Sequence, residues 1–296
     1  MRRLSAAELM LLVTVSIWAF NFTVTRYALT HGFEPLAYSA TRFTSAAILV
    51  SCITYGLEGS LRFKRRHALL LAGAAFVGIY LNSLAFVYSV DLTNASTVAL
   101  IFGSLPIFTA VIAYAVGIER LHRRFWIAAG ISFVGVVFVA LGSNGGVSGN
   151  LLGDILALIA TATWGAYSVA IVPLLRHYSV WRISAGALVV ASVPLLATAI
   201  PQLLRQDWDL EGLVWACLVF SVLGPLVLTN VLWFTAIERV GPSRATLVTN
   251  LQPFLAALFA VALLSEELTW LQVAGGIAIG VALFLARLRR PTPEST

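Results

Sequence analysis

The residues best suited to bind a small molecule lie inside long apolar runs of this chain. Trp18 and Asn21 are three positions apart, and Trp164 and Tyr167 repeat that spacing in the second half. Residues three or four apart share one face of a helix, so each pair would present a flat ring and a polar group to the same space. Such faces can stack on flat or apolar parts of a ligand. For either ring alone, packing inside the protein is the alternative.

Further polar and aromatic residues recur at corresponding places in the two halves. Asn82 followed by Phe86 is matched by Asn230 followed by Phe234. Asparagine side chains also bond between membrane helices, so either asparagine could be structural. The candidate substrate-binding residues are together Trp18, Asn21, Tyr80, Asn82, Phe86, Phe102, Trp164, Tyr167, Asn230, Phe234, Asn250 and Gln252.

Two prolines are expected to interrupt helices at equivalent places. A helical proline lacks the N–H that would bond the carbonyl four residues back. Pro106 would therefore free the carbonyl of Phe102, and Pro253 that of Thr249. Interrupted helices at matching positions in two halves indicate a transport site, with the prolines as hinges. A simple packing kink is the alternative.

Arg42 is the one cation that lies well inside an apolar run. Its expected depth is roughly 10 Å from the outer end of its helix, at 1.5 Å per residue. A charge at such depth is a functional candidate. Arg42 could meet a substrate carboxylate, or it could be a structural partner for backbone carbonyls, and the structural role is the favoured interpretation.

The sequence lacks the signatures of common enzyme and metal sites. It contains no P-loop, no His-Glu-x-x-His, no Gly-x-Ser-x-Gly and no paired carboxylates in an apolar run. Cys52 and Cys217 both lie inside apolar runs, which suggests neither a disulfide framework nor a metal site. We therefore expect a protein that is not an enzyme and that holds no metal and no cofactor.

The elements that position these residues must be membrane helices. Hydrophobic residues make up 59% of the 296 residues, charged residues only 11%, and the mean hydropathy is +0.91. A soluble domain carries roughly 25% charged residues. Apolar runs of about 20 residues, each long enough to cross a bilayer as a helix, recur along the chain. The predicted spans are 9–29, 35–56, 68–90, 94–117, 124–141, 152–173, 180–201, 211–237, 244–265 and 270–288.

The distribution of basic residues predicts the orientation of these ten spans. Arginine and lysine cluster in the loops near 62–66, 120–124 and 239–244, whereas the loops on the other side hold only Arg205. Basic loops stay in the cytoplasm, so both termini should be cytoplasmic. The net charge of +6 therefore reflects topology, and nucleic acid is not an expected partner.

Matching features appear in the same order in both halves, which indicates an internal duplication. The glycine-dense stretch 142–153 separates them, so the predicted repeats are residues 1–143 and 144–296. Because five spans is an odd number, the second repeat must start on the opposite side of the membrane. The expected fold is an all-α membrane protein of ten helices, arranged as two inverted five-helix repeats, an architecture found in many secondary transporters.

This order of features resembles the drug/metabolite transporter superfamily, of the ten-helix type with two EamA-like repeats. The residues that carry the resemblance are Trp18 and Trp164, Thr41-Arg42-Phe43, Pro106 with Glu119, and Pro253 with Glu266. Within the superfamily the chain looks most similar to bacterial exporters of aromatic and other amino acids. The resemblance implies an exporter in the bacterial cytoplasmic (inner) membrane, working by alternating access, with a small-molecule substrate. An exporter of sugars, nucleosides or drug-like cations is the alternative.

All acidic residues fall at or beyond predicted span ends, so a midplane proton relay is not evident. We therefore expect a uniporter, with a proton-coupled antiporter as the alternative. A receptor or scaffold is disfavoured because the loops are short. The repeated spacing of Gly130 and Gly135 in Gly275 and Gly280 suits close helix packing or a homodimer contact.

Overall fold

The computed structural model describes residues 5–92, 98, 101–142, 150–255, 258–259 and 269–287. Within these ranges the regular structure is helical, and no strand is present. The elements, in chain order, are α1 (Ala6–Thr30), α2 (Pro35–Glu58), α3 (Arg65–Ala75), η1 (Phe76–Leu81), α4 (Asn82–Leu92), α6 (Leu105–Ala115), α7 (Arg123–Leu141), α8 (Leu151–Ala170), α9 (Val172–Leu175), α10 (Val180–Arg205), α11 (Gly212–Ser221), η2 (Val222–Leu228), α12 (Thr229–Val240), α13 (Pro242–Thr249) and α15 (Trp270–Arg287).

Local sequence signals account for several helix ends. Ser5 caps α1, accepting a hydrogen bond from the backbone N–H of Glu8, whose carboxylate accepts one from the Ser5 N–H in return. Asn150 caps α8 by accepting bonds from the second and third helical N–H groups. α2 ends at Gly59, which has a positive φ of 67° that suits glycine.

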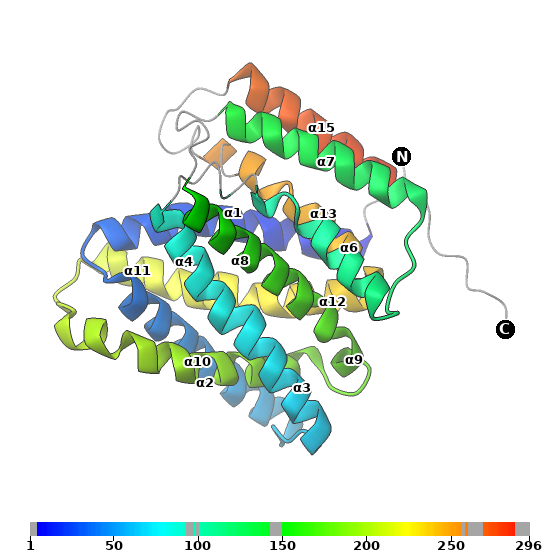
Figure 1. Ribbon diagram of the computed structural model, residues 1–296. Coiled ribbons are helices and arrows are strands. Elements are labelled where there is room, and N and C mark those ends of the chain that lie inside the picture. Colours follow the sequence, from blue (N-terminus) through cyan, green and yellow to red (C-terminus); the bar gives the residue numbers. More distant parts are fainter. Residues whose placement is uncertain are drawn as a thin grey trace.

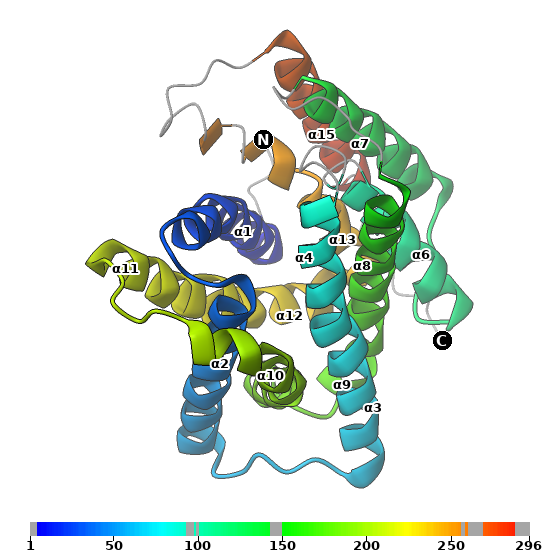
Figure 2. The same cartoon turned by 60° about the vertical axis from the view of Figure 1, so that its left-hand side comes forward.

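Two helix pairs lie on opposite sides of the molecule, with α1, α8, α12 and α13 between them (Figures 1 and 2). α2 packs along α10 on one side, and α7 packs along α15 on the other (Figures 1 and 2). Between them, α1 contacts α12, α4 contacts α8, and α6 contacts α13. Each of these five pairs joins a helix of the first half to one of the second half, so the two halves are interleaved through the whole structure.

Seven helices are long and apolar enough to cross a membrane, judged by length and composition. They are Ala6–Thr30, Pro35–Glu58, Arg65–Phe86, Arg123–Leu141, Leu151–Leu175, Val180–Arg205 and Gly212–Val240. Shorter apolar helices occupy Leu105–Ala115 and Trp270–Ala286. The predicted spans 94–117 and 244–265 include residues outside the described ranges, so the count of ten spans stays a prediction, as do the repeat boundaries and the inversion.

The α7/α15 pair is held at a glycine contact. A Cβ added to Gly135 would lie 2.7 Å from the carbonyl oxygen of Gly275, and one added to Gly275 would lie 2.5 Å from the carbonyl oxygen of Gly135. Only glycine allows two helices to approach this closely. Gly130 and Gly280, the other members of the predicted pairs, have open space beside them.

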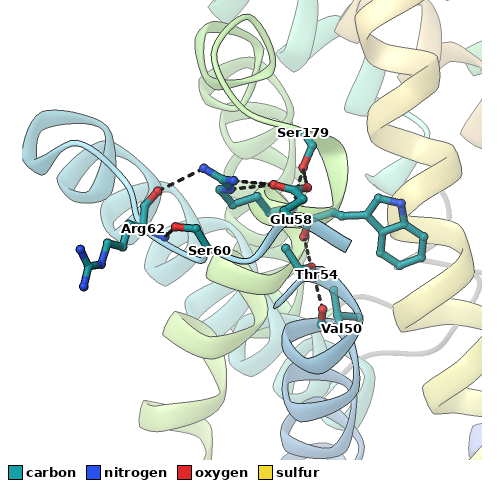
Figure 3. Close-up of polar contacts among 8 residues, drawn as sticks. Val50, Thr54, Glu58, Ser60, Arg62 and Ser179 are labelled. Atoms are coloured by element: carbon teal, nitrogen blue, oxygen red, sulfur yellow. Dashed lines mark hydrogen bonds and ion pairs between the residues drawn. The ribbon is translucent and has the colours of Figure 1, made fainter. Parts of the chain in front are cut away.

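A salt bridge and several hydrogen bonds join the end of α2 to the start of α10 (Figure 3). Glu58 forms a salt bridge with Arg182, at 2.6 Å between Oε2 and Nη2. Ser179 caps the start of α10 and also donates to the Glu58 carboxylate. Thr54 donates to the carbonyls of Val50, at 2.7 Å, and of Trp181, at 3.2 Å. The last turn of α2 is therefore bonded directly to the first turn of α10.

Candidate functional site

Spans three and eight contain wide helical turns at corresponding places. The π-helical segment η1 lies between α3 and α4, and η2 lies between α11 and α12. Segments of this kind are rare and frequently occur at functional sites. Asn82 follows η1 directly, and Asn230 follows η2 by two residues. The repeated asparagines thus mark the ends of two irregular segments, one in each half of the chain.

The segment η2 supports Trp18 through a short hydrogen-bond chain. The indole Nε1 of Trp18 donates to the hydroxyl oxygen of Thr229, at 2.9 Å. The Thr229 hydroxyl donates in turn to the carbonyl of Pro225, which lies within η2. The position of the Trp18 ring is therefore coupled to the backbone of the π segment.

The segment η1 supports Tyr167 by direct contact. Gly78 lies in η1, and a Cβ at this position would overlap the Tyr167 side chain, at 2.5 Å from its Cγ. Tyr167 is 2% exposed, so it has little room to move away. Glycine at position 78 is what lets the η1 backbone lie against this ring.

Trp18 and Trp164 meet in a cluster of rings at the centre of the molecule. Their ring centroids are 5.8 Å apart in an edge-to-face arrangement, and the Trp233 ring lies 5.1 Å from Trp18 and 6.5 Å from Trp164. Tyr167 lies 5.6 Å from Trp164 and 6.0 Å from Phe234. These rings, which we call the aromatic cluster, come from α1, α8 and α12. They fill their own centre, since Trp233 and Phe234 are 1% and 0% exposed.

Two polar atoms in the aromatic cluster are buried without a partner among the described residues. They are the hydroxyl of Tyr167 and the indole Nε1 of Trp233. A buried donor without a hydrogen bond costs roughly 1–3 kcal/mol. Such donors in a native structure require an explanation. A ligand with an acceptor group would explain them, because it would form the missing hydrogen bonds.

The predicted breaks in spans four and nine lie against each other. The chain turns at Gly103 and Ser104 before α6, and at Asn250 and Leu251 after α13. The side-chain amide of Asn250 donates to the carbonyl of Gly103, at 3.2 Å, and to the hydroxyl of Ser132, at 3.0 Å. Asn250 is buried. Its bond to Gly103 joins the two breaks, and its bond to Ser132 connects the second break to α7.

Each proline lies just after a break between two helical stretches. Pro106 is the second residue of α6, and Pro253 is likewise the second residue after the turn at 250–251. Each proline therefore begins a new helical stretch, where its missing N–H costs nothing. The chain is therefore interrupted by a turn at each site and is not bent within a continuous helix. Their role as hinges stays a prediction.

The remaining predicted residues are spread around the aromatic cluster. Asn82 donates to the carbonyl of Ala160 at 2.5 Å, and Asn230 to that of Leu226 at 2.5 Å. Phe86 contacts Phe102, with centroids 5.6 Å apart. Tyr80 packs against the buried core that contains Tyr167, Trp233 and Phe234. Gln252 directly follows the turn at residues 250–251.

Sequence reasoning missed a polar chain that joins α2, α11 and α1. The Tyr38 hydroxyl lies 2.5 Å from the Ser221 hydroxyl, and Ser221 donates to the side-chain carbonyl of Asn21 at 2.8 Å. Arg42 lies one turn along α2 from Tyr38. Neither Tyr38 nor Ser221 recurs in a motif, so no spacing signal distinguishes them.

Glu119, in the loop between α6 and α7, contacts the start of α13. Its carboxylate accepts a hydrogen bond from the backbone N–H of Ser243, at 3.3 Å, and fills the space beside Gly241, whose φ is 83°. Burial raises the pKa of Glu119, against the opposing effects of the Ser243 hydrogen bonds and the charge of Arg244. Glu119, which belongs to the Pro106/Glu119 motif, thus connects the loop after α6 to α13.

A small cavity near this loop lies away from the aromatic cluster. It has a volume of about 40 Å³ and is lined by Arg120, Leu121, His122, Arg124, Phe125, Arg244, Leu285 and Ala286. That volume holds about one water. It is therefore not a candidate substrate site.

Comparisons with known proteins show what this chain resembles. The uncharacterized transporter YdeK of Bacillus subtilis (strain 168) is 28% identical over 276 residues, covering 93% of this chain and 94% of that protein. The uncharacterized inner membrane transporter YedA of Escherichia coli (strain K12) is 25% identical over 280 residues, covering 90% and 85%. A solved structure described as "Crystal structure of protein" shares the fold, with a TM-score of 0.82, 17% identity and coverage of 97% and 98%.

A family model adds the decisive match. The model of the EamA-like transporter family matches residues 5–141 and, a second time, residues 151–288. Its two matches cover nearly the whole chain, on both sides of the glycine-dense stretch. The protein is a membrane transporter and belongs to the EamA-like transporter family.

Proposed function

We propose that this transporter exports amino acids, aromatic ones included, and related small metabolites by alternating access. The observation that carries the proposal is the aromatic cluster, in which rings from both halves of the chain meet beside two π-helical segments. Flat rings offer stacking surfaces to an aromatic or apolar side chain. The free donors of Tyr167 and Trp233 offer hydrogen bonds to an acceptor on the substrate.

The packing of the cluster suggests how a substrate would pass. In this structure the rings contact one another, so a substrate enters only when the halves move apart. Substrate then replaces ring-to-ring contacts, and the coupling of Trp18 to η2 and of Tyr167 to η1 transmits its binding to the two π segments. Exchange between an opening on one face and an opening on the other would complete a transport cycle.

We further propose uniport in the bacterial inner membrane, with both termini in the cytoplasm. Among the described helices, every Asp, Glu and His lies within four residues of an end of its helix. A proton relay commonly uses such groups deep in the membrane, so the arrangement favours movement of substrate down its own gradient. The basic loops support the orientation.

Uptake of a labelled panel into proteoliposomes tests the function. Amino acids, sugars and nucleosides are each supplied outside, with protein-free liposomes as the control. We expect aromatic and other neutral amino acids to equilibrate without an ion gradient and never to become concentrated. Uptake of sugars or nucleosides alone would contradict the substrate class. Accumulation driven by an imposed pH or sodium step, and abolished by an ionophore, would contradict uniport.

A further inference from the structure

Arg42 is a cation placed inside a membrane-spanning helix. It lies seven residues from Pro35, the first residue of α2, which is roughly 10 Å along the helix at 1.5 Å per residue. Charged side chains at this depth normally pair with one another or with backbone carbonyls. The question is therefore what neutralises Arg42.

The immediate surroundings of Arg42 satisfy it only in part. Its guanidinium carbon lies 5.4 Å from the ring centroid of Tyr38 and 5.2 Å from that of Phe43. Rings at this distance attract a cation through their faces. The Arg42 Nε is nevertheless buried without a hydrogen bond, and no carboxylate of the described part of the chain lies within 4 Å of the guanidinium. A desolvated donor and a charge remain without an anion.

The position of Arg42 connects it to the aromatic cluster. Phe43, which covers the guanidinium, belongs to the same buried core as Trp164 and Trp233. The hydroxyls of Tyr38 and Ser221 and the side chain of Asn21 form a continuous polar chain from α2 through α11 to α1. Asn21 shares a face of α1 with Trp18. Polar groups thus lead from the turn that carries Arg42 to the cluster.

We propose that Arg42 is a carboxylate subsite, which receives the carboxylate of the substrate beside the aromatic cluster. A guanidinium presents parallel N–H donors that match the two oxygens of a carboxylate. The aromatic cluster would hold the side chain of the same molecule. The inference rests on the proposed function, because it assumes that the cluster binds amino acids, and it adds which end of the amino acid Arg42 recognises.

Three ligands separate the carboxylate from the rest of the molecule. Tryptophan carries a carboxylate and an amine, indole-3-propionate carries only the carboxylate, and tryptamine carries only the amine. Each is measured as a competitor of labelled tryptophan in proteoliposomes. For the unaltered protein we expect tryptophan and indole-3-propionate to compete more strongly than tryptamine.

Variants of Arg42 then test whether this preference for a carboxylate depends on the Arg42 side chain. We expect Arg42→Gln to weaken tryptophan and indole-3-propionate by about ten- to hundredfold, the loss typical of a hydrogen bond to a charged group, and to leave tryptamine unchanged. Arg42→Lys should restore part of the affinity because it keeps the charge. Arg205→Gln, which removes an exposed arginine at the end of α10, is the matched control and should change none of the three.

The outcomes distinguish the subsite from the function. Equal weakening of all three ligands by Arg42→Gln in folded protein would overturn the carboxylate subsite while leaving amino-acid transport intact. If the glutamine variant does not fold, the competition assay on the unaltered protein tests the proposal. Tryptamine competing as well as tryptophan would then overturn the proposal. Failure of the folded, unaltered protein to bind any of the three ligands would overturn the proposed function together with the subsite.

Discussion

The centre of this transporter and its α7/α15 pair both depend on glycine, with different consequences. In the α7/α15 pair, Gly135 and Gly275 bring two regular helices into backbone contact. At the centre, Gly78 brings the backbone of a π-helical segment against the side chain of Tyr167. The first contact joins two helices to each other, whereas the second joins an irregular backbone to a candidate substrate-binding ring.

This difference separates packing from function. A substitution in the α7/α15 pair should act mainly on stability, because no residue of the aromatic cluster lies on either helix. A substitution at the centre should act on transport as well, because the π segments carry the contacts that place Trp18 and Tyr167.

The largest effect is expected from Gly78→Ala. The added methyl group would overlap the buried Tyr167 side chain, so the ring or η1 must move. Overpacking of this kind costs about 1–3 kcal/mol of stability. We expect transport per folded molecule to fall at least about tenfold, measured as initial uptake into proteoliposomes.

Gly73→Ala is the matched control for this substitution. Gly73 lies in α3, five residues before Gly78, is exposed, and has open space where a Cβ would be. Alanine there should leave transport unchanged and stabilise the helix by about 0.5–1 kcal/mol. Equal loss of transport in both variants would contradict a specific role for the contact between Gly78 and Tyr167.

Gly275→Ala tests the α7/α15 pair. Its methyl group would lie 2.5 Å from the carbonyl oxygen of Gly135, and we expect a loss of about 1–3 kcal/mol in stability. Thermal unfolding in detergent measures this loss, with Gly280→Ala as the control because that site is open. Transport per folded molecule should persist. A change in substrate affinity without a change in stability would contradict the separation drawn above.

A smaller effect on transport is expected from Trp18→Ala. The substitution removes ring contacts to Trp164 and Trp233 and the hydrogen bond to Thr229. Loss of an aromatic partner costs on the order of 1 kcal/mol, so the KM for tryptophan should rise about fivefold. Trp126→Ala removes a tryptophan on α7 that is 38% exposed and should leave the KM unchanged. Normal kinetics in the Trp18 variant would remove this ring from the site.

The smallest effect concerns the pH dependence of stability at Glu119. Burial raises the pKa of this carboxyl above its ordinary value of 4.5. The folded protein therefore holds the proton to higher pH than the unfolded chain does. Protonated Glu119 therefore contributes fully to stability when the pH is below the carboxyl pKa of the unfolded chain. This contribution is lost as the pH rises through the higher pKa of the folded protein.

Glu119→Gln should remove this loss. The variant keeps an oxygen that can accept from the Ser243 N–H but carries no charge. Relative to the unaltered protein, it should become more stable as pH rises from 4 to 7.5, measured by thermal unfolding at both pH values. Glu238→Gln, at an exposed position in the last turn of α12, is the control. An identical pH dependence in the Glu119 variant and the unaltered protein would reject the effect of burial.

Much of this arrangement could be predicted from the sequence, because hydropathy and repetition report it directly. Seven of the predicted spans correspond to long apolar helices. The repeated positions of Trp18 and Trp164 predicted two substrate-binding rings, and in the structure these rings contact each other. The π segments could not be predicted in the same way, because a wide turn depends on what packs beside it. Both segments contain a glycine, Gly78 in η1 and Gly224 in η2, but only η2 contains a proline, Pro225. The chain from Tyr38 through Ser221 to Asn21 joins three distant helices, and no local pattern records it.

The most direct test of a transport path through the aromatic cluster is the accessibility of a cysteine at position 229. Thr229 is fully buried and bonded to Trp18. Thr229→Cys would be made in a protein whose two native cysteines, Cys52 and Cys217, are replaced by alanine. A membrane-impermeant thiol reagent is then applied from either face of proteoliposomes that transport tryptophan. We predict slow labelling from both faces, and slower labelling when tryptophan is present. A transport-active protein whose cysteine is labelled from neither face would contradict a path through the cluster.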